Sequence, residues 1–374
     1  MSSTQDCLII AGEKSGEELA MSFLPELRKR VPHIKFFGVG GDSLLEQKVE
    51  ILYHLKDFSS MGVSDVIKKI PFYKKALDRL EAEAVERKIK VAILIDFQDF
   101  NLRLARRLAR HGVKVLYYVA PQAWIWKSYR AKVLSEVTHT LFTLLPFEKD
   151  WFTKRGVKNV ISVQHPLLTT YHEQLKSIRP KEMSSPIKIL LLPGSRHFEV
   201  EEMLPIFIDA IKKLKDKFPV EVHLVKVNHL DSKYYARFED VVDQSYSDSD
   251  IQQPLKDCHL CLATSGTVTL TTGLFSLPTV VCYKSTLLNE FIFRNFVKYH
   301  GPISLTNIIL GERVYPEYIQ GSVVPDLLAN KLENWIRNSD EYAKTVHRLE
   351  KTKDLLAGDQ LNIPEYMSGV FYEP

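Results

Sequence analysis

Two carboxylates and an amide follow a run of apolar residues near position 95. The segment LIDFQDFNLRL places Asp96, Asp99 and Asn101 between a predicted buried strand at 91–96 and a predicted helix at 101–111. Each of these side chains could cap that helix, yet one helix does not need two caps. A carboxylate in a cleft can instead accept a proton from a substrate hydroxyl. Asp99 is the candidate base, and Asn101 lies near enough to orient it or a sugar.

A turn of small residues joins a predicted strand at 187–195 to a predicted helix at 199–217. Gly194 and Ser195 can leave backbone N–H groups free there, and Arg196 adds a guanidinium. Free amides at a helix N-terminus beside a cation favour the binding of a diphosphate. The simpler alternative is a strand-to-helix turn whose serine caps the helix.

A similar turn follows the predicted strand at 259–266. Ser265, Gly266 and Thr267 precede a predicted helix at 267–276. Capping is again the alternative, but two such turns in one region favour a shared anionic ligand. Neither turn is a Walker A loop, because no G-K-[ST] follows, and the N-terminal glycines lack the G-x-G-x-x-G spacing. A dinucleotide site is therefore only weakly supported.

Aromatic and basic residues alternate in APQAWIWKSYRAK. Trp124 and Trp126 lie beside Lys127, Arg130 and Lys132. Aromatic rings between cations can bind RNA or stack on a sugar ring, and they can also simply pack in a core.

The segment MGVSDVIKKIPFYKKALDRL mixes apolar and basic side chains. Apolar faces rimmed by lysines dock on anionic bilayers or admit acyl chains, whereas the plain alternative is an ordinary amphipathic helix. The residues of this candidate membrane patch are Met61, Lys68, Lys69, Phe72, Tyr73, Lys74 and Lys75.

The overall composition is that of a globular protein with no obligatory nucleic-acid partner. The 374 residues carry a net charge of +4, and 45% of them are hydrophobic. The four cysteines lie in apolar stretches, which favours a reduced compartment. Cys258 and Cys261 form one C-x-x-C pair around His259, but without a second cluster a buried strand is the better interpretation. No secretory signal or membrane-spanning stretch is expected.

Strands and helices alternate along most of the chain. This alternation predicts an α/β protein with two Rossmann-like domains whose mostly parallel sheets face each other across a cleft. A polar, proline-containing segment at 176–187 is the candidate linker. We expect an N-terminal domain at 1–180, a second domain at 181–345, and a C-terminal helix and tail at 346–374.

Ten short motifs occur in a familiar order along the chain. They are AGEKSG, GVGG, MGVSDV, IDFQDFNLRLA, YYVAPQAWIW, LLPFEKDWF, QHPL, LLPGSRHFEV, SGTVTL and SLTNIILG. Together they resemble the lipid-A-disaccharide synthase family. The resemblance implies a GT-B glycosyltransferase that transfers 2,3-diacylglucosamine from UDP to 2,3-diacylglucosamine 1-phosphate, giving the β-1,6-linked lipid A disaccharide with inversion.

The resemblance also assigns roles to residues of this chain. Asp99 becomes the base that activates the attacking 6-hydroxyl. On the donor side the motifs match at Gly194, Ser195, Arg196, Ser265, Gly266, Thr267 and Asn307. On the acceptor side they match, more weakly, at Glu13, Ser15, Asn101 and Gln122. The C-terminal tail is expected, by analogy, to cross back to the N-terminal domain.

The family's setting adds further expectations. The resemblance implies a peripheral protein on the cytoplasmic face of the bacterial inner membrane, with the two acylated sugars and the membrane surface as partners. It implies no metal, no cofactor and no nucleic acid. A monomer and a homodimer both remain open.

Some positions depart from the family pattern. Glu17, Gln98, Gln164 and Thr306 replace its usual Asp, Pro, Gly and Pro, and Thr271 replaces a Glu that holds the ribose hydroxyls in related enzymes. A threonine offers one hydroxyl in place of a bidentate acceptor. Another GT-B enzyme of UDP-sugars, such as a UDP-GlcNAc 2-epimerase, and a non-catalytic family member therefore remain as alternatives.

Overall fold

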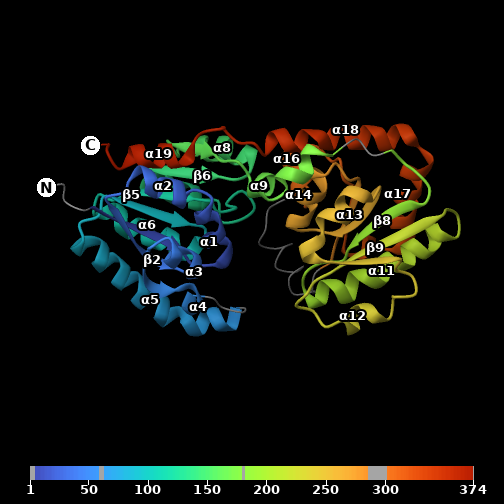
Figure 1. Ribbon diagram of the computed structural model, residues 1–374, viewed down its shortest axis with the longest axis horizontal. Coiled ribbons are helices and arrows are strands. Elements are labelled where there is room, and N and C mark those ends of the chain that lie inside the picture. The colour runs from blue at the N-terminus through green and yellow to red at the C-terminus, as the bar shows by residue number, and fades with distance from the viewer. Residues whose placement is uncertain (1–4, 59–62, 179–181, 285–300, 374) are drawn as a thin grey trace. The chain divides into compact units, whose positions relative to one another are not determined.

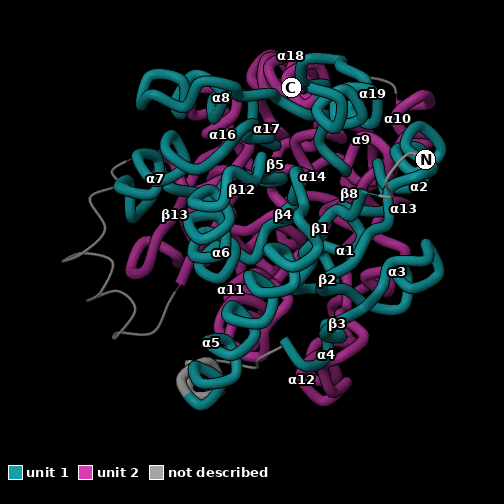
Figure 2. Tube along the Cα trace, turned by 90° about the vertical axis from the view of Figure 1, so that its left-hand side faces the viewer, with its two compact units in different colours: residues 1–166, 357–374 teal, residues 167–356 magenta. Residues whose placement is uncertain are grey.

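The chain forms two α/β units, which Figure 2 shows in different colours. The computed structural model describes residues 5–58, 63–178, 182–284 and 301–373. Unit 1 comprises residues 1–166 together with 357–374, and unit 2 comprises residues 167–356. The chain thus returns to unit 1 after completing unit 2.

A parallel sheet of seven strands runs through the described part of unit 1, in the order β3-β2-β1-β4-β5-β6-β7. The central strand β4 has the sequence VAILI and is buried along its whole length, as expected for a parallel strand that is covered on both faces. The strands are β1 (Gln5–Ala11), β2 (Ile34–Gly40), β3 (Glu50–His54), β4 (Val91–Ile95), β5 (Lys114–Tyr118), β6 (Thr140–Thr143) and β7 (Val160–Ser162).

Helices cover both faces of this sheet (Figure 1). Alternate residues of each strand point to opposite faces, so Leu94 joins one core and Ile93 joins the other. The helices of unit 1 are α1 (Lys14–Met21), α2 (Leu24–Arg30), α3 (Asp42–Glu46), α4 (Leu55–Phe58), α5 (Val63–Glu86), α6 (Gln98–Arg110), α7 (Tyr129–Val137), α8 (Pro146–Thr153) and α19 (Ile363–Val370).

Helix α19 lies in the segment that the sequence analysis interprets as a tail. Its N-cap Asn362 accepts a hydrogen bond from the Glu365 backbone N–H, and a proline stands in its first turn. Met367 and Val370 are buried in the core that also holds α2. The segment therefore completes one face of unit 1.

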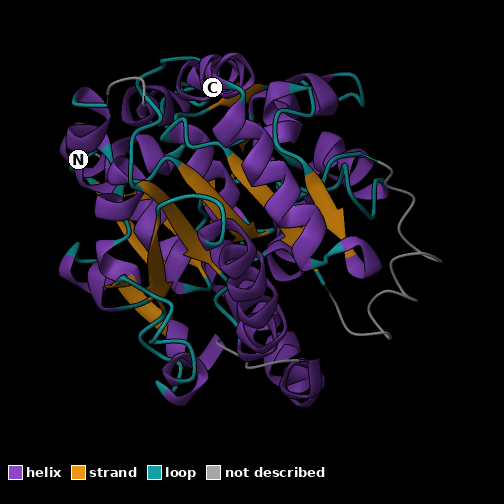
Figure 3. Cartoon of the chain, turned by 90° about the vertical axis from the view of Figure 1, so that its right-hand side faces the viewer, coloured by secondary structure: helices purple, strands orange, loops and turns teal. Residues whose placement is uncertain are grey.

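Unit 2 is built on a second parallel sheet, in the order β10-β9-β8-β11-β12-β13 (Figure 3). Its core joins β8 to α11 and α17 through Leu191, Phe207 and Leu328. The strands are β8 (Ile187–Leu192), β9 (Val220–Lys226), β10 (Gln244–Ser247), β11 (Leu260–Thr264), β12 (Thr279–Tyr283) and β13 (Glu317–Ile319).

The helices of unit 2 vary widely in length. The long helix α11 runs through Pro205 without a break, and α18 is the last element of the unit. The helices are α9 (Pro166–Thr170), α10 (His172–Lys176), α11 (His197–Lys215), α12 (Lys233–Ala236), η1 (Asp248–Asp250), α13 (Gln252–Asp257), α14 (Thr267–Leu274), α16 (Leu305–Leu310), η2 (Gln320–Ser322), α17 (Pro325–Arg337) and α18 (Ser339–Leu355). None of the described helices is long and apolar enough to cross a membrane.

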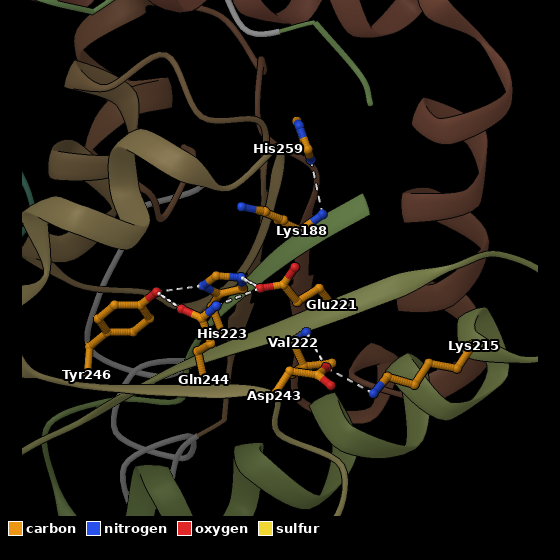
Figure 4. A network of polar contacts seen from close by, with 9 residues as sticks. All are labelled: Lys188, Lys215, Glu221, Val222, His223, Asp243, Gln244, Tyr246 and His259. Carbon is orange, nitrogen blue, oxygen red and sulfur yellow. Dashed lines mark hydrogen bonds and ion pairs between the residues drawn. The ribbon is translucent and has the colours of Figure 1, made fainter. Parts of the chain in front are cut away.

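Polar side chains secure the edge of the second sheet (Figure 4). The Asp243 carboxylate accepts hydrogen bonds from the Val222 backbone N–H at 2.7 Å and from the Lys215 ammonium at 3.1 Å. The Nδ1 atom of His259 accepts the Lys188 backbone N–H at 3.0 Å, which ties the start of β11 to β8. Cys261 lies within the buried strand β11, whereas Cys258 is buried at the C-cap of α13, so the strand interpretation holds for the second cysteine of the C-x-x-C pair and is wrong for the first.

Each sheet has one place where its strand order reverses. In unit 1 this switch point lies between β1 and β4, and in unit 2 it lies between β8 and β11. Ligands of open α/β sheets bind beyond the carboxyl ends of the strands at such points. The turns after these four strands contain Glu13, Asp96, Arg196 and Gly266. These turns are therefore the candidate ligand-binding positions of the two units.

Candidate active site

The turn between β4 and α6 has an uncommon backbone conformation. Asp96 and Phe97 have φ angles of +48° and +44°, in the left-handed region that costs a residue with a side chain free energy. The Asn101 Nδ2 group donates hydrogen bonds to the Ile95 and Asp96 carbonyls, at 3.1 and 2.8 Å. A Cβ on Gly12 would lie 2.7 Å from the Phe97 ring, so glycine makes room for this turn. Asn101 therefore holds the turn in place.

The Asp99 carboxylate is fixed by two cations. Arg130 Nη2 lies 2.5 Å from Oδ1, and Lys127 Nζ lies 3.5 Å from Oδ2. Arg130 is buried on α7, and its other terminal nitrogen donates to Gln98 Oε1 at 2.7 Å. Burial raises the pKa of Asp99, but the hydrogen bond and charge of Arg130, with Lys127, outweigh it and lower the pKa below 3.8. Asp99 is therefore ionised at neutral pH.

The second carboxylate of this turn behaves differently. Burial, followed by the negative charge of Glu13, raises the pKa of Asp96, and a hydrogen bond from the Phe97 backbone opposes the shift only in part. The two aspartates thus face one region in different electrostatic settings. This is the pattern in which one carboxyl holds a proton more tightly than its neighbour.

Both aspartates line a cavity of about 1060 Å³ that lies wholly within unit 1. Its walls come from the ends of β1 and β4 and from the facing helices α5 and α6. The lining residues are Glu13, Ile70, Tyr73, Lys74, Leu77, Asp96, Phe97, Gln98, Asp99, Phe100, Arg103, Arg106, Arg107, Arg110, Lys127 and Tyr129. Carboxylates, cations and apolar groups therefore border one space.

The candidate acceptor residues are not all placed alike. Glu13 lines the cavity, whereas Ser15 and Gln122 are exposed and are not among its lining residues. Asn101 is completely buried, with its amide nitrogen occupied by the backbone of the turn. Direct contact between Asn101 and a sugar would require that turn to open, so its place in the structure is that of a support for Asp96.

In unit 2, the turn after β8 is closed by its own helix. Gly194 has a φ angle of +120°, and a Cβ there would lie 2.5 Å from the Glu199 Cβ. The Glu199 carboxylate accepts the Ser195 and Arg196 backbone N–H groups at 2.9 and 3.2 Å, and also the Arg196 guanidinium at 2.8 Å. The amides expected to be free for a diphosphate are thus bound to a carboxylate that the sequence interpretation overlooked.

The turn after β11 is more open. Gly266 is the N-cap of α14 and provides no side-chain cap, and nothing lies within 4 Å of where its Cβ would be. Gly266 and Thr267 are exposed, whereas Ser265 Oγ donates to the Ile303 carbonyl at 3.1 Å. Thr264 Oγ1 donates to the Pro193 carbonyl at 2.8 Å, so the two turns of unit 2 are neighbours.

Asn307 lies beneath this region with its side chain fully buried. Its Oδ1 accepts the Val314 and Tyr315 backbone N–H groups at 2.9 and 2.8 Å, and its Nδ2 donates to the Tyr315 carbonyl and to Glu317. The amide is therefore saturated by protein groups and positions the backbone. Thr271, at the position where the family pattern has Glu, is likewise buried in α14.

The comparisons with known proteins agree on the family. A model of the lipid-A-disaccharide synthetase family matches residues 7–371. The chain belongs to this family. The lipid-A-disaccharide synthase of Myxococcus xanthus is 34% identical over 341 residues, which cover 88% of each chain. That of Nitrosococcus oceani is 32% identical over 374 residues, covering 96% of this chain and 94% of the other.

Solved structures show the same fold at much lower identity. A glycotransferase of kitacinnamycin superposes with a TM-score of 0.59 at 11% identity, covering 98% of each chain. A UDP-N-acetylglucosamine 2-epimerase from Listeria monocytogenes, itself named as putative, gives a TM-score of 0.55 at 10% identity over 94% of each chain. The GT-B fold and the glycosyltransferase class are therefore confirmed, and the synthase family takes precedence over the epimerase alternative.

A synthase of acylated sugars needs contact with lipid, so the candidate membrane patch is relevant. The structure places some of its residues at the surface and packs others into unit 1. Met61 lies outside the described residues. Lys68, Lys74 and Lys75 are exposed, and Lys74 also lines the cavity. Lys69 donates to the Asp57 carbonyl at 2.8 Å.

Phe72 and Tyr73, by contrast, are half-buried in a cluster of aromatic rings that centres on Phe58. Tyr73 Oη also donates to the Phe58 carbonyl at 2.7 Å. Trp124 packs edge-on against Phe147, and its indole N–H donates to Glu148 at 3.0 Å. These aromatic residues act mainly in packing, because the rings find their partners within unit 1.

Two features of the synthase site escaped the sequence interpretation. Arg130 appears in the sequence as one of several cations near a tryptophan pair, and only the fold brings it to Asp99. The arginines of α6 were visible as a pattern, since NLRLARRLAR places arginine opposite leucine at helical spacing. That spacing would have identified a cationic helix face.

Proposed function

We propose that this protein transfers a diacylated glucosamine from UDP to the 6-hydroxyl of a diacylated glucosamine 1-phosphate, with inversion at the anomeric carbon. The observation that carries the proposal is the cavity of unit 1, where the ionised Asp99 shares one space with cationic and apolar side chains. An acceptor that is at once a sugar, a phosphate and a lipid needs all three kinds of contact.

In this mechanism Asp99 accepts the proton of the acceptor 6-hydroxyl as the hydroxyl oxygen attacks the donor's anomeric carbon. The new C–O bond forms as the bond to the UDP oxygen breaks, and UDP departs with the electron pair of that bond. Arg130 keeps Asp99 ionised and fixes its orientation. Because it lowers the pKa of Asp99, it also makes the carboxylate a weaker base. The 3.5 Å contact with Lys127 is the looser one and is the contact that an incoming hydroxyl would replace.

The donor belongs, in this proposal, to unit 2. The exposed N-terminus of α14 at Gly266 and Thr267 offers uncapped amides to the diphosphate, and Arg196 offers a cation from the neighbouring turn. Developing negative charge on the leaving diphosphate is stabilised by such fixed dipoles without rearrangement. Ser195 and Gly194 shape the turn, and Asn307 positions the backbone beneath it.

We also propose a peripheral location on the cytoplasmic face of the bacterial inner membrane. On α5, Ile70 is 55% exposed, and the exposed Lys74 lies one turn further along the same face, while Lys68 is exposed on the preceding turn. Apolar groups rimmed by lysines bind anionic bilayers. Ile70→Ser should weaken co-sedimentation with phosphatidylglycerol vesicles, whereas Val85→Ser on the same helix, which is 46% exposed, should not. Equal binding of both variants would reject this patch.

The test of the reaction is a turnover assay with UDP-2,3-diacylglucosamine and 2,3-diacylglucosamine 1-phosphate. We expect equimolar UDP and disaccharide, with a β-1,6 linkage by NMR. Omitting the acceptor should stop UDP release, which separates transfer from hydrolysis. Binding of UDP with no disaccharide at any enzyme concentration would reject the transferase and leave a nucleotide-binding protein. UDP-N-acetylglucosamine should not be epimerised under the same conditions.

A further inference from the structure

One side of helix α6 presents a row of arginines to the cavity. Arg103, Arg106, Arg107 and Arg110 all line it, and the last three follow Arg103 by three, four and seven residues, so all four share a face of the helix. Lys74 reaches the same cavity from α5. The opposite side of α6 carries Leu104 and Leu108, which are buried in the core of unit 1. The row is therefore a fixed feature of a helix that packing holds in place.

Most of this row is not neutralised by protein groups. Arg107 Nη1 donates to Asp78 at 2.7 Å and to Glu81 at 3.1 Å. Arg103, Arg106 and Arg110 are exposed, and among the residues whose side chains are described they have no hydrogen bond or ion pair. A cation in the last turn, such as Arg110, is favoured by the helix dipole, but Arg103 and Arg106 lie further back. Neighbouring like charges on a helix repel one another, so an anion bound there would relieve that repulsion.

The position of the row relative to Asp99 suggests what that anion is. Asp99 begins the same helix, and Arg103 and Arg106 follow it by about 6 and 10 Å along the axis, at about 1.5 Å per residue. In a hexosamine 1-phosphate C1 and C5 both adjoin the ring oxygen, so the 1-phosphate and the 6-hydroxyl project from the two sides of that oxygen, within one helical turn of each other. A sugar with its 6-hydroxyl at Asp99 can therefore direct its phosphate toward these arginines.

The facing wall of the cavity completes the match. Ile70 and Leu77 of α5 supply apolar surface opposite the arginines, with Lys74 between them in sequence. Acyl chains would find apolar contacts there, while the phosphate stays beside the cations. A free inorganic phosphate would use only the cationic part of this surface.

The geometry points to Arg103 and Arg106, assisted by Lys74, as the subsite that binds the phosphate monoester of the acylated sugar acceptor. This inference rests on the proposed function and deepens it, because it assigns acceptor selection to a specific face of α6. Guanidinium groups bind phosphate oxygens through paired, charge-assisted hydrogen bonds, so a glutamine at either position should not replace them.

The experiment compares two acceptors in neutral detergent micelles, the 2,3-diacylglucosamine 1-phosphate and the same lipid without its phosphate. The double variant Arg103→Gln/Arg106→Gln should lose about 10- to 100-fold in kcat/KM for the phosphorylated acceptor, as expected for lost charge-assisted contacts. It should lose little for the dephosphorylated one, and UDP affinity should stay unchanged. The control Arg28→Gln, on α2 and outside the cavity, should behave as wild type.

The outcomes separate this inference from the proposed function. If the double variant turns over the phosphorylated acceptor as well as wild type does, the subsite is rejected and the transferase stands. If the variant keeps its acceptor preference but loses binding to phosphatidylglycerol vesicles, the row binds lipid headgroups of the bilayer, and the subsite is again rejected.

If wild type turns over neither acceptor, the proposed function fails, and calorimetric titration of each lipid into wild type and variant then decides the subsite alone. Equal binding of both lipids by wild type would reject it, whereas a phosphate preference that the variant lacks would support it. Circular dichroism checks folding, and the two single variants serve if the double variant is unstable.

Discussion

The switch points of the two units have the same topology and opposite electrostatic arrangements. In unit 1 a carboxylate, Asp99, is held by cations from a different part of the unit, Arg130 and Lys127. In unit 2 a cation, Arg196, is held by Glu199, a carboxylate of its own helix three residues away. The first pair depends on tertiary structure, whereas the second can form in an isolated helix turn.

This difference suggests different roles for the two pairs. Arg130 is almost completely buried, so its contact with Asp99 is fixed by packing. The Arg196 side chain is 82% exposed, and exposed ion pairs of this kind contribute only about 0.2–1 kcal/mol to stability. The Arg196 guanidinium is therefore free to change partners at little cost, whereas the Ser195 and Arg196 backbone N–H groups remain bound to Glu199. In the proposed mechanism, unit 1 therefore supplies a fixed carboxylate, and unit 2 supplies a cation whose protein partner a bound diphosphate would replace.

The largest effect is expected from breaking the unit 1 pair at its carboxylate. Asp99→Asn keeps the size of the side chain and removes the base, so kcat should fall by about 10²- to 10⁴-fold. UDP affinity, measured by calorimetry, should stay within about twofold, because Asp99 makes no donor contact in the proposed mechanism. Asp150→Asn, at an exposed position on α8, is the matched control.

Two results would contradict this assignment. A variant at position 99 that keeps most of its kcat would remove Asp99 from the chemistry and make Asp96 the next candidate base. A loss of UDP affinity equal to the loss of rate would mean that Asp99 supports donor binding instead.

The next largest effect concerns the support of the turn. Asn101→Ala leaves the Ile95 and Asp96 carbonyls without their side-chain donor, which should lower the free energy of unfolding by about 1–3 kcal/mol. Urea unfolding measures this change, and kcat should fall with it because the left-handed turn leads directly into the first turn of α6, which carries Asp99. Asn159→Ala removes a single exposed hydrogen bond to the His139 carbonyl and should cost much less. Equal losses of unfolding free energy for the two variants would show that the turn keeps its conformation without the Asn101 hydrogen bonds.

The pH profile tests how Arg130 acts on Asp99. Because Arg130 and Lys127 hold the pKa of Asp99 below that of an ordinary aspartate, the carboxylate persists as pH falls, and the acid limb of wild-type kcat/KM should lie at lower pH than an ordinary aspartate would give. In Arg130→Gln, burial is opposed by Lys127 alone, so the pKa of Asp99 should rise and the acid limb should move to higher pH. Lys132→Gln on the same helix is the control. An acid limb at the same pH in Arg130→Gln and wild type would show that Arg130 does not control the protonation of the base.

The fold was largely predictable because buried parallel strands have a strong sequence signature. All-apolar runs such as VAILI and CLIIA fall on β4 and β1, and the parallel arrangement of the strands follows from their alternation with helices. The weakly apolar edge strand β3 was missed, since its five residues are only partly buried. Residues 16–30 carry one continuous helical periodicity in the sequence, yet the structure divides them between α1 and α2, with Pro25 in the first turn of α2.

The site was predictable in its position and not in its contacts. The sequence places Asp99, Arg196 and Gly266 after strand ends, and the structure has them at the switch points of the two sheets. Sequence spacing could not show that Arg130, thirty-one residues after Asp99, forms an ion pair with it, because that contact depends on how α7 packs. The role of Glu199 could have been predicted, since a glutamate three residues after the N-cap of a helix is part of the capping-box pattern.

A smaller effect should follow from weakening the unit 2 pair. Glu199→Gln keeps a side chain that can still cap the helix but removes the negative charge that competes with a diphosphate. UDP should then bind up to about tenfold more tightly, a change of about 1.4 kcal/mol. Glu201→Gln, which removes an exposed carboxylate from the same helix, is the control. Weaker UDP binding in Glu199→Gln would mean that the carboxylate orders the turn for the ligand.

The smallest structural effect is expected at Gly266. A Cβ there meets nothing within 4 Å, and its backbone is extended, so Gly266→Ala should change the free energy of unfolding by less than about 0.5 kcal/mol. Gly194 differs, because its φ angle of +120° and its contact with Glu199 already require glycine in the folded protein. If Gly266→Ala leaves stability intact and still weakens UDP binding, the open space above α14 is where the diphosphate approaches the backbone. If both quantities are unchanged, the diphosphate does not bind at that turn, and the donor site of unit 2 must lie nearer Arg196.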